Sequence, residues 1–158
     1  MKFRKLQTNT QGTLYLHNMP GRSRPHRYDY IEDCVEAMKQ LQITTIICLV
    51  SDKEINQKSP DYAVAIAEEK IPAERICFPI PNYKVPEDTE AFYQLARKVA
   101  DRLKSGENLL VHCAGGIGRT GMLAGCVLAA LGLPQDALEE SGSGPEDEEQ
   151  EKIIRNFY

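Results

Sequence analysis

The chain has 158 residues, of which 42% are hydrophobic and 27% charged, and its formal net charge is −4. These values indicate one globular domain over residues 1–158 and exclude a disordered chain. The acidic balance argues against a nucleic-acid binder, because duplex binding depends on clustered Lys and Arg. No apolar run approaches the ~20 residues of a membrane span, so we expect a monomer with neither a nucleic acid nor a membrane as partner.

Strand and helix patterns alternate along the chain. They predict, in chain order, a strand at 13–17, a helix at 30–41, a strand at 43–50, a helix at 59–70, a strand at 75–78, a helix at 86–105, a strand from 108, a helix at 119–131 and a last helix after the acids at 146–149. The β-branched run at 43–50 is typical of a buried strand, and Ser59-Pro60-Asp61 is typical of a helix start. The alternation predicts an α/β fold with a central, mostly parallel sheet flanked by helices. The segment 141–145 is predicted to be flexible.

The five cysteines do not follow a disulfide or zinc spacing. The first five residues lack the apolar core of a signal peptide. Both observations indicate a reduced, cytoplasmic protein. Four of the cysteines lie in apolar stretches and are expected to pack in the core: Cys34, Cys48, Cys77 and Cys126.

The segment 111–121, Val-His-Cys-Ala-Gly-Gly-Ile-Gly-Arg-Thr-Gly, carries the clearest functional signal. It joins a predicted strand to a predicted helix. Its three glycines let the loop N–H groups converge, and the helix N-terminus adds more donors, so the loop predicts a phosphate-binding cup. The expected phosphate-binding residues are Ala114, Gly115, Gly116, Ile117, Gly118 and Arg119.

Cys113 lies where the bound anion would lie, so we expect it to be a thiolate at neutral pH. Arg119 offers a planar two-pronged donor for phosphoryl oxygens and for their charge in the transition state. Thr120 can hydrogen-bond the sulfur, and His112 is expected to fix the loop rather than act as a base. The arrangement predicts attack on a phosphoester. The alternative is a buried cysteine in a glycine-rich turn.

The pattern His112-Cys113 with Arg119-Thr120-Gly121 resembles the signature of the cysteine-based protein tyrosine phosphatases. The surroundings are similar to the compact dual-specificity branch, near the kinase-associated and Cdc14-type phosphatases, over nearly the whole chain. The resemblance implies hydrolysis of phosphomonoesters through a phosphocysteine, without cofactor or metal. The matching segments outside the loop are 12–21, 46–54, 79–81 and 149–154.

The resemblance also implies roles for residues outside the loop. Gln150 would position the water that hydrolyses the phosphocysteine, or it is an exposed helix residue. The stretch with Asp52 and Glu54 would supply a structural partner for the signature arginine. Arg22, Arg24, His26 and Arg27 form a basic cluster that could attract a phosphorylated partner or simply be a solvated loop.

The general acid departs from the family pattern. The family places an aspartate where this chain has Asn82, 31 positions before Cys113. An amide cannot give a proton to the leaving oxygen, and general acid catalysis is worth roughly 10²–10⁴-fold. If no other acid replaces Asn82, aryl phosphates should remain the best substrates, since a phenol with a pKa of about 10 leaves more easily than an alkoxide. Asp88 is the first candidate for a substitute acid, and its alternative role is to stabilise the first turn of a helix.

Three functions follow from these residues. The leading one is a phosphoprotein phosphatase acting on phosphotyrosine, with phosphoserine and phosphothreonine left open. The second is a phosphate-binding reader or weakly active phosphatase, because of Asn82, although the presence of both Cys113 and Arg119 favours an enzyme. The third is a phosphatase of a non-protein phosphomonoester such as a lipid or an RNA 5′ end.

Overall fold

The computed structural model describes residues 2–157, which form one five-stranded sheet in the order β1-β2-β5-β3-β4. The central strands run parallel, and β1 pairs with β2 in the antiparallel sense at one edge. The strands are β1 (Arg4–Leu6), β2 (Leu14–His17), β3 (Ile43–Cys48), β4 (Glu74–Cys77) and β5 (Asn108–His112). The predicted α/β fold with a mostly parallel sheet is therefore confirmed.

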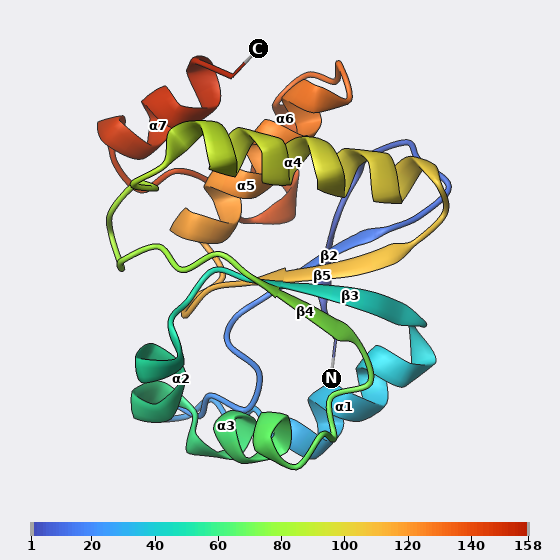
Figure 1. Cartoon of the computed structure of the whole chain (residues 1–158), viewed down its shortest axis with the longest axis vertical. Helices are drawn as coiled ribbons and strands as arrows, with labels where there is room; N and C mark the ends of the chain where they lie inside the picture. The colour runs from blue at the N-terminus through green and yellow to red at the C-terminus, as the bar shows by residue number, and fades with distance from the viewer. Residues whose placement is uncertain (1, 158) are drawn as a thin grey trace.

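Helices cover both faces of the sheet (Figure 1). One layer contains α1 (Ile31–Gln40), α2 (Asp52–Lys58) and α3 (Pro60–Ala67), and the other contains α4 (Thr89–Lys104), α5 (Gly118–Ala130), α6 (Asp136–Ser141) and α7 (Glu148–Arg155). Because β5 lies in the middle of the sheet between two such layers, Leu109, Leu110 and Val111 are fully buried. Within residues 2–157, no helix is both long and apolar enough to span a bilayer.

Side-chain caps fix where several helices begin. Ser59 accepts a hydrogen bond from the N–H three residues later at 3.4 Å, and α3 begins at Pro60 as predicted. Asp88 accepts the equivalent bond at 3.0 Å, so α4 begins at Thr89 rather than at residue 86. The carboxylate of Asp88 is thereby committed to the first turn of α4.

Three elements of the structure were not predicted from the sequence. β1 has three residues and α6 has six, which is too short for a periodic pattern. α2 follows Ser51, whose hydroxyl accepts from the Glu54 N–H at 3.1 Å. A Ser followed three residues later by Glu is the spacing of a capping box, so this helix did carry a readable signal.

Two sequence-based predictions are wrong. Cys77 is exposed rather than part of the core, because β4 is an edge strand. The segment 141–145, predicted to be flexible, is anchored by Arg4, whose Nη1 donates to Ser141 O and to Ser143 Oγ, each at 2.9 Å. Both serines are buried. The small residues of this segment permit close packing against α5 rather than free motion.

Candidate active site

The loop between β5 and α5 wraps around the sulfur of Cys113. The Gly116 N–H donates to Cys113 Sγ at 3.2 Å, and the Thr120 hydroxyl donates to it at 3.1 Å. Gly116 has a φ of 76°, and a Cβ there would lie 2.9 Å from backbone atoms of His17 and Asn18, so glycine alone fits this turn. The sulfur therefore lies buried at the floor of the loop with two donors directed at it.

Hydrogen bonds to Glu54 and to Ile80 O fix the orientation of the Arg119 guanidinium. Its Nη1 and Nη2 donate to the two Glu54 carboxylate oxygens at 2.8 and 2.7 Å, and Nη1 also donates to Ile80 O at 2.8 Å. Burial by itself would raise the pKa of Glu54, but the hydrogen bonds from Arg119 and Lys58 lower it to about 2. Arg119, only 2% exposed, is thus a buried cation held by a partner that is ionised at neutral pH.

His112 supports the loop from the side of the core. Its Nε2 shares a hydrogen bond of 2.9 Å with the Tyr62 hydroxyl, and its Nδ1 lies 3.1 Å from Cys113 O. Complete burial lowers the pKa of His112 to about 4, so the ring is neutral at pH 7. A neutral ring with both nitrogens engaged in this way orients the backbone at Cys113.

A pocket of about 360 Å³ opens above the sulfur. Asn82 and Tyr83, from the loop after β4, line one wall, and Lys58 from α2 lines another. The Tyr83 side chain is 63% exposed and presents an aromatic surface at the rim. The pocket is also lined by five of the predicted phosphate-binding residues: Ala114, Gly115, Ile117, Gly118 and Arg119.

Glu146 brings a carboxyl group to this pocket. Its Oε1 lies against Gly118, where any Cβ would overlap it. Among the lining residues supplied by the described chain, Asp88 does not occur, because its side chain caps α4. The structure therefore brings Glu146, rather than Asp88, to the pocket that Asn82 lines. From sequence, Glu146 was assigned only to the dipole of the last helix.

Gln150 is fully buried, not an exposed helix residue. Its Oε1 accepts from the Glu146 N–H at 2.8 Å, and its Nε2 donates to Lys84 O at 3.2 Å. The amide therefore connects the segment that carries Glu146 to the loop that carries Asn82. The structure gives Gln150 this connecting position and leaves its role toward a water molecule a prediction.

Three side chains outside the catalytic pocket have the residue types of a metal site. Ligand atoms of His17, Asp29 and Cys34 all lie within 4.8 Å of one another. Each already has a hydrogen bond, since His17 Nε2 and Asn18 Nδ2 both lie 3.2 Å from Asp29 Oδ2 and Cys34 Sγ lies 3.2 Å from Oδ1. Burial and the Asp29 charge raise the pKa of Cys34 to about 12, which keeps the thiol protonated. Protein groups thus satisfy the cluster without a metal.

Sequence reasoning missed Arg4, Lys58 and Tyr83. Arg4 Nη2 donates to Gly116 O at 2.7 Å from a strand that the sequence did not reveal. Lys58 lies four residues after Glu54, and this spacing predicts the observed ion pair of 2.8 Å on α2. Tyr83 follows the acid-loop position directly, but nothing in its spacing indicates that it faces the pocket.

The chain is similar in sequence to known phosphatase domains. The family model described as PTP-SAK, the DSP-PTPase phosphatase domain of Swiss Army Knife proteins, matches residues 12–156. Protein 197R of Invertebrate iridescent virus 6, which carries the name of a tyrosine phosphatase, is 34% identical over 71 residues, 42% of this chain and 27% of the viral protein. The chain thus spans about a quarter of that relative.

Solved structures share the fold at low identity. Kinase associated phosphatase, in a form with its catalytic cysteine replaced by serine, superposes with a TM-score of 0.81 at 19% identity, covering 99% of this chain and 93% of that one. PTPMT1 in complex with PI(5)P superposes with a TM-score of 0.68 at 13% identity, covering 93% and 90%. Proteins with different names and ligands therefore share this fold, and the fold alone does not identify the substrate.

Proposed function

Since the chain belongs to the PTP-SAK family, the DSP-PTPase phosphatase domains of Swiss Army Knife proteins, we propose that it hydrolyses phosphotyrosine in proteins through a phosphocysteine intermediate. One observation supports this most directly. The Cys113 sulfur lies in a pocket lined by the glycine-rich loop, next to a loop N–H donor and to an arginine fixed by Glu54. A phosphorylated substrate would bind with its phosphorus above that sulfur. No metal takes part in this scheme.

The reaction has two displacements at phosphorus. The Cys113 sulfur, as a thiolate, forms the S–P bond while the bond to the tyrosine oxygen breaks, and that oxygen takes up a proton. Water then attacks the phosphocysteine, the S–P bond breaks, and inorganic phosphate leaves. Arg119 and the loop N–H groups stabilise the charge on the three other oxygens in both steps. The Thr120 hydroxyl, 3.1 Å from the sulfur, stabilises it as the leaving group of the second step.

Glu146 is the proton donor that we propose in place of Asn82. A carboxyl group can deliver the proton that an amide cannot. Glu146 lines the same pocket as Asn82, and the Gln150 amide links the two segments that carry them. Asp88 remains the alternative acid, and it would have to leave its cap on α4 to reach the substrate.

The walls of the pocket favour an aryl phosphate. Tyr83 presents its ring at the rim, where it can stack on the ring of a phosphotyrosine.

The alternative function is a phosphate reader that binds without turnover because Asn82 cannot act as an acid. A reader needs Arg119 and the loop but has no use for a buried sulfur with two donors directed at it.

Turnover of aryl phosphates with different leaving groups tests both the reaction and the acid. We expect Cys113→Ser to abolish turnover. Glu146→Gln should lower kcat by at least about tenfold for phenyl phosphate but less for p-nitrophenyl phosphate, because a better leaving group needs less protonation. Asp88→Asn is the matched control and should leave both rates close to wild type. Asn82→Asp should increase turnover of phenyl phosphate most.

Other outcomes point elsewhere. If Asp88→Asn, and not Glu146→Gln, lowers turnover of phenyl phosphate more than turnover of p-nitrophenyl phosphate, Asp88 is the acid. A uniform loss for both substrates in Glu146→Gln means that this residue holds the pocket in shape only. Binding of a phosphopeptide without turnover by wild type or Asn82→Asp establishes the reader instead.

A further inference from the structure

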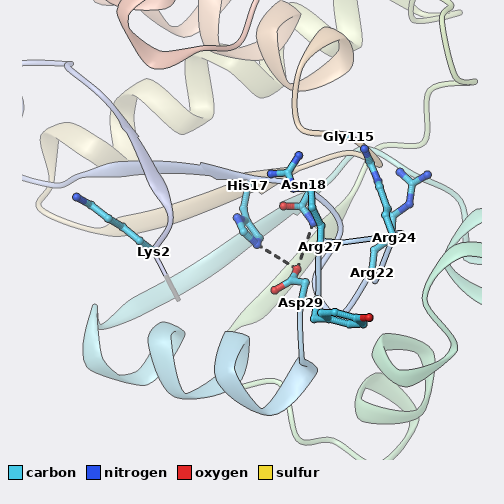
Figure 2. A pocket seen from close by; sticks show the side chains of 9 residues that line it. Lys2, His17, Asn18, Arg22, Arg24, Arg27, Asp29 and Gly115 are labelled. Atoms are coloured by element: carbon cyan, nitrogen blue, oxygen red, sulfur yellow. Dashed lines mark hydrogen bonds and ion pairs between the residues drawn. The ribbon is translucent and has the colours of Figure 1, made fainter.

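A second cavity, of about 290 Å³, lies beside the catalytic pocket. The two cavities share part of their lining: Arg22, Arg24, Arg27 and Gly115 contribute to both. Figure 2 shows the three arginines together near Gly115, with Lys2 on the far side of His17. The Arg24 guanidinium lies over the phosphate loop, since its Nη2 would be 3.5 Å from a Cβ at Gly115.

The sheet places these arginines next to the phosphate loop. β2 pairs with β5 so that His17 lies opposite His112, and the chains leaving the two strands therefore run side by side. The Met19 N–H donates to Ala114 O at 3.0 Å and ties them together. Gly21 has a φ of 74°, and the arginines that follow it line the same two cavities as Gly115. Backbone contacts therefore hold the segment that carries Arg22, Arg24 and Arg27 in place beside the phosphate loop.

Two of the arginines are held facing each other. The Arg24 N–H donates to Arg27 O at 2.8 Å, and the Arg27 N–H donates to Arg24 O at 2.9 Å, which makes them a directly opposed antiparallel pair. Side chains of such a pair lie on the same face, and like charges there repel. Burial lowers the pKa of Arg22, and the neighbouring Arg24 charge lowers it further. An anion between these side chains would relieve that repulsion.

The protein offsets this charge only in part, because Glu54, whose charge acts on Arg22, is itself bonded to Arg119 and Lys58. Throughout residues 2–157, no carboxylate forms an ion pair with Arg22, Arg24 or Arg27. Among the described residues, Asp29 is the only acidic one that lines the cavity. Its oxygens already receive hydrogen bonds from three neighbouring side chains. The positive charge around Asp29 also opposes binding of a metal cation there.

We propose that this cavity is a second phosphate-binding subsite, and that the substrate is a protein segment with another phosphate close to the phosphotyrosine. This inference rests on the proposed function. Arginine forks bind phosphate with paired hydrogen bonds. The segment is favoured over a membrane lipid because exposed Tyr28 lines the cavity, exposed Tyr30 stacks on it with ring centroids 6.3 Å apart, and the acidic first turn of α1 follows directly. Acidic side chains repel an anionic bilayer, whereas exposed aromatic rings can bind a peptide.

Matched peptides test the subsite. One carries phosphotyrosine alone, and the other carries phosphotyrosine with phosphoserine or phosphotyrosine one to three positions away. For wild type we expect kcat/KM to be about tenfold higher for the best doubly phosphorylated peptide. Arg24→Gln and, separately, Arg27→Gln should each lower this preference. Arg155→Gln, on the exposed face of α7, is the control for loss of positive charge alone and should retain it.

The outcomes separate this inference from the proposed function. If phenyl phosphate is not turned over by wild type, the reaction itself is wrong. If phenyl phosphate is turned over and the two kinds of peptide are equally good, the subsite is wrong. An Arg24-dependent preference for a soluble inositol bisphosphate, or for PI(5)P vesicles, over every doubly phosphorylated peptide overturns the assignment to a protein segment. If Arg155→Gln loses the preference for doubly phosphorylated peptides to the same extent, net charge explains that preference and the subsite is wrong.

Discussion

The arginines near the phosphate loop fall into two groups. Arg119 has an ionised partner in Glu54, through two hydrogen bonds that define the plane of its guanidinium. Arg22 and Arg24, half-buried a short distance away, have no such partner among residues 2–157. The first arrangement holds a catalytic group in one orientation before substrate arrives. The second leaves charge available for a ligand, since a cation already paired gains less from a phosphate.

His112 should make the stability of the protein depend on pH. Its pKa is lowered by burial to about 4, whereas in the unfolded chain it lies near the ordinary 6.5. Between these values the unfolded state binds more protons than the folded state, so the free energy of unfolding falls as pH drops through that window. We expect a loss of up to about 3 kcal/mol between pH 7 and pH 4. Urea unfolding at pH 7.0, 5.5 and 4.5 measures it.

Two variants isolate the imidazole. His112→Asn should be less stable at pH 7 but should show a smaller decrease toward pH 4.5. Tyr62→Phe removes the hydroxyl partner and keeps the titrating ring, so the decrease should remain. Glu54 does not interfere, because a pKa of about 2 places its contribution below pH 4.5. Parallel pH curves for wild type and His112→Asn would exclude His112 as the cause.

At the scale of elements, the parts that could be predicted are those with a local pattern. The strand–loop–helix around Cys113 was readable because an apolar run, three glycines and an arginine are adjacent in sequence, and the resemblance based on it is confirmed. β1 and α6 were not readable, because their positions are set by contacts with distant residues such as Arg4 with Ser141. Glu146 was missed for the same reason, since its place at Gly118 depends on how the last segment packs on α5.

The packing of α5 against the segment before α7 gives a second prediction. A Cβ at Gly121 would lie 2.5 and 2.6 Å from Cα and C of Gly144, and backbone atoms cannot move aside as a side chain can. Gly144 N–H also donates to Ile117 O at 3.1 Å, which ties this segment to the phosphate loop. Gly121→Ala should therefore displace the segment, at a cost of about 1–3 kcal/mol in stability, and lower kcat.

Gly144→Ala is the control for that contact. A Cβ at Gly144 meets nothing within 4 Å, and its φ is not in the left-handed region. We expect its stability to lie within about 0.5 kcal/mol of wild type and its kcat to be unchanged. Thermal unfolding and phenyl phosphate turnover of both variants check the pair. Equal behaviour of the two alanine variants would mean that α5 and the segment separate without cost.

For the whole molecule, Arg4 joins parts that are far apart in sequence. From the edge strand β1 its guanidinium reaches Gly116 O in the phosphate loop, Ser141 O at the end of α6 and Ser143 Oγ. Ser143 Oγ also donates to Gly116 O at 2.6 Å. The first strand, the catalytic loop and the last third of the chain are therefore coupled through one side chain. Catalysis should depend on this coupling although Arg4 does not line the catalytic pocket.

Arg4→Gln tests whether the coupling positions the loop or only supports the fold. Loss of three hydrogen bonds should cost about 2–4 kcal/mol in stability and, because Gly116 also supplies a donor to Cys113 Sγ, should lower kcat more than it raises KM. Arg4→Lys keeps the charge but reaches fewer acceptors and should recover part of kcat. Lys5→Gln, exposed on the same strand, should match wild type. If Arg4→Gln unfolds at lower temperature yet retains its kcat at 25 °C, Arg4 stabilises the fold without positioning the loop.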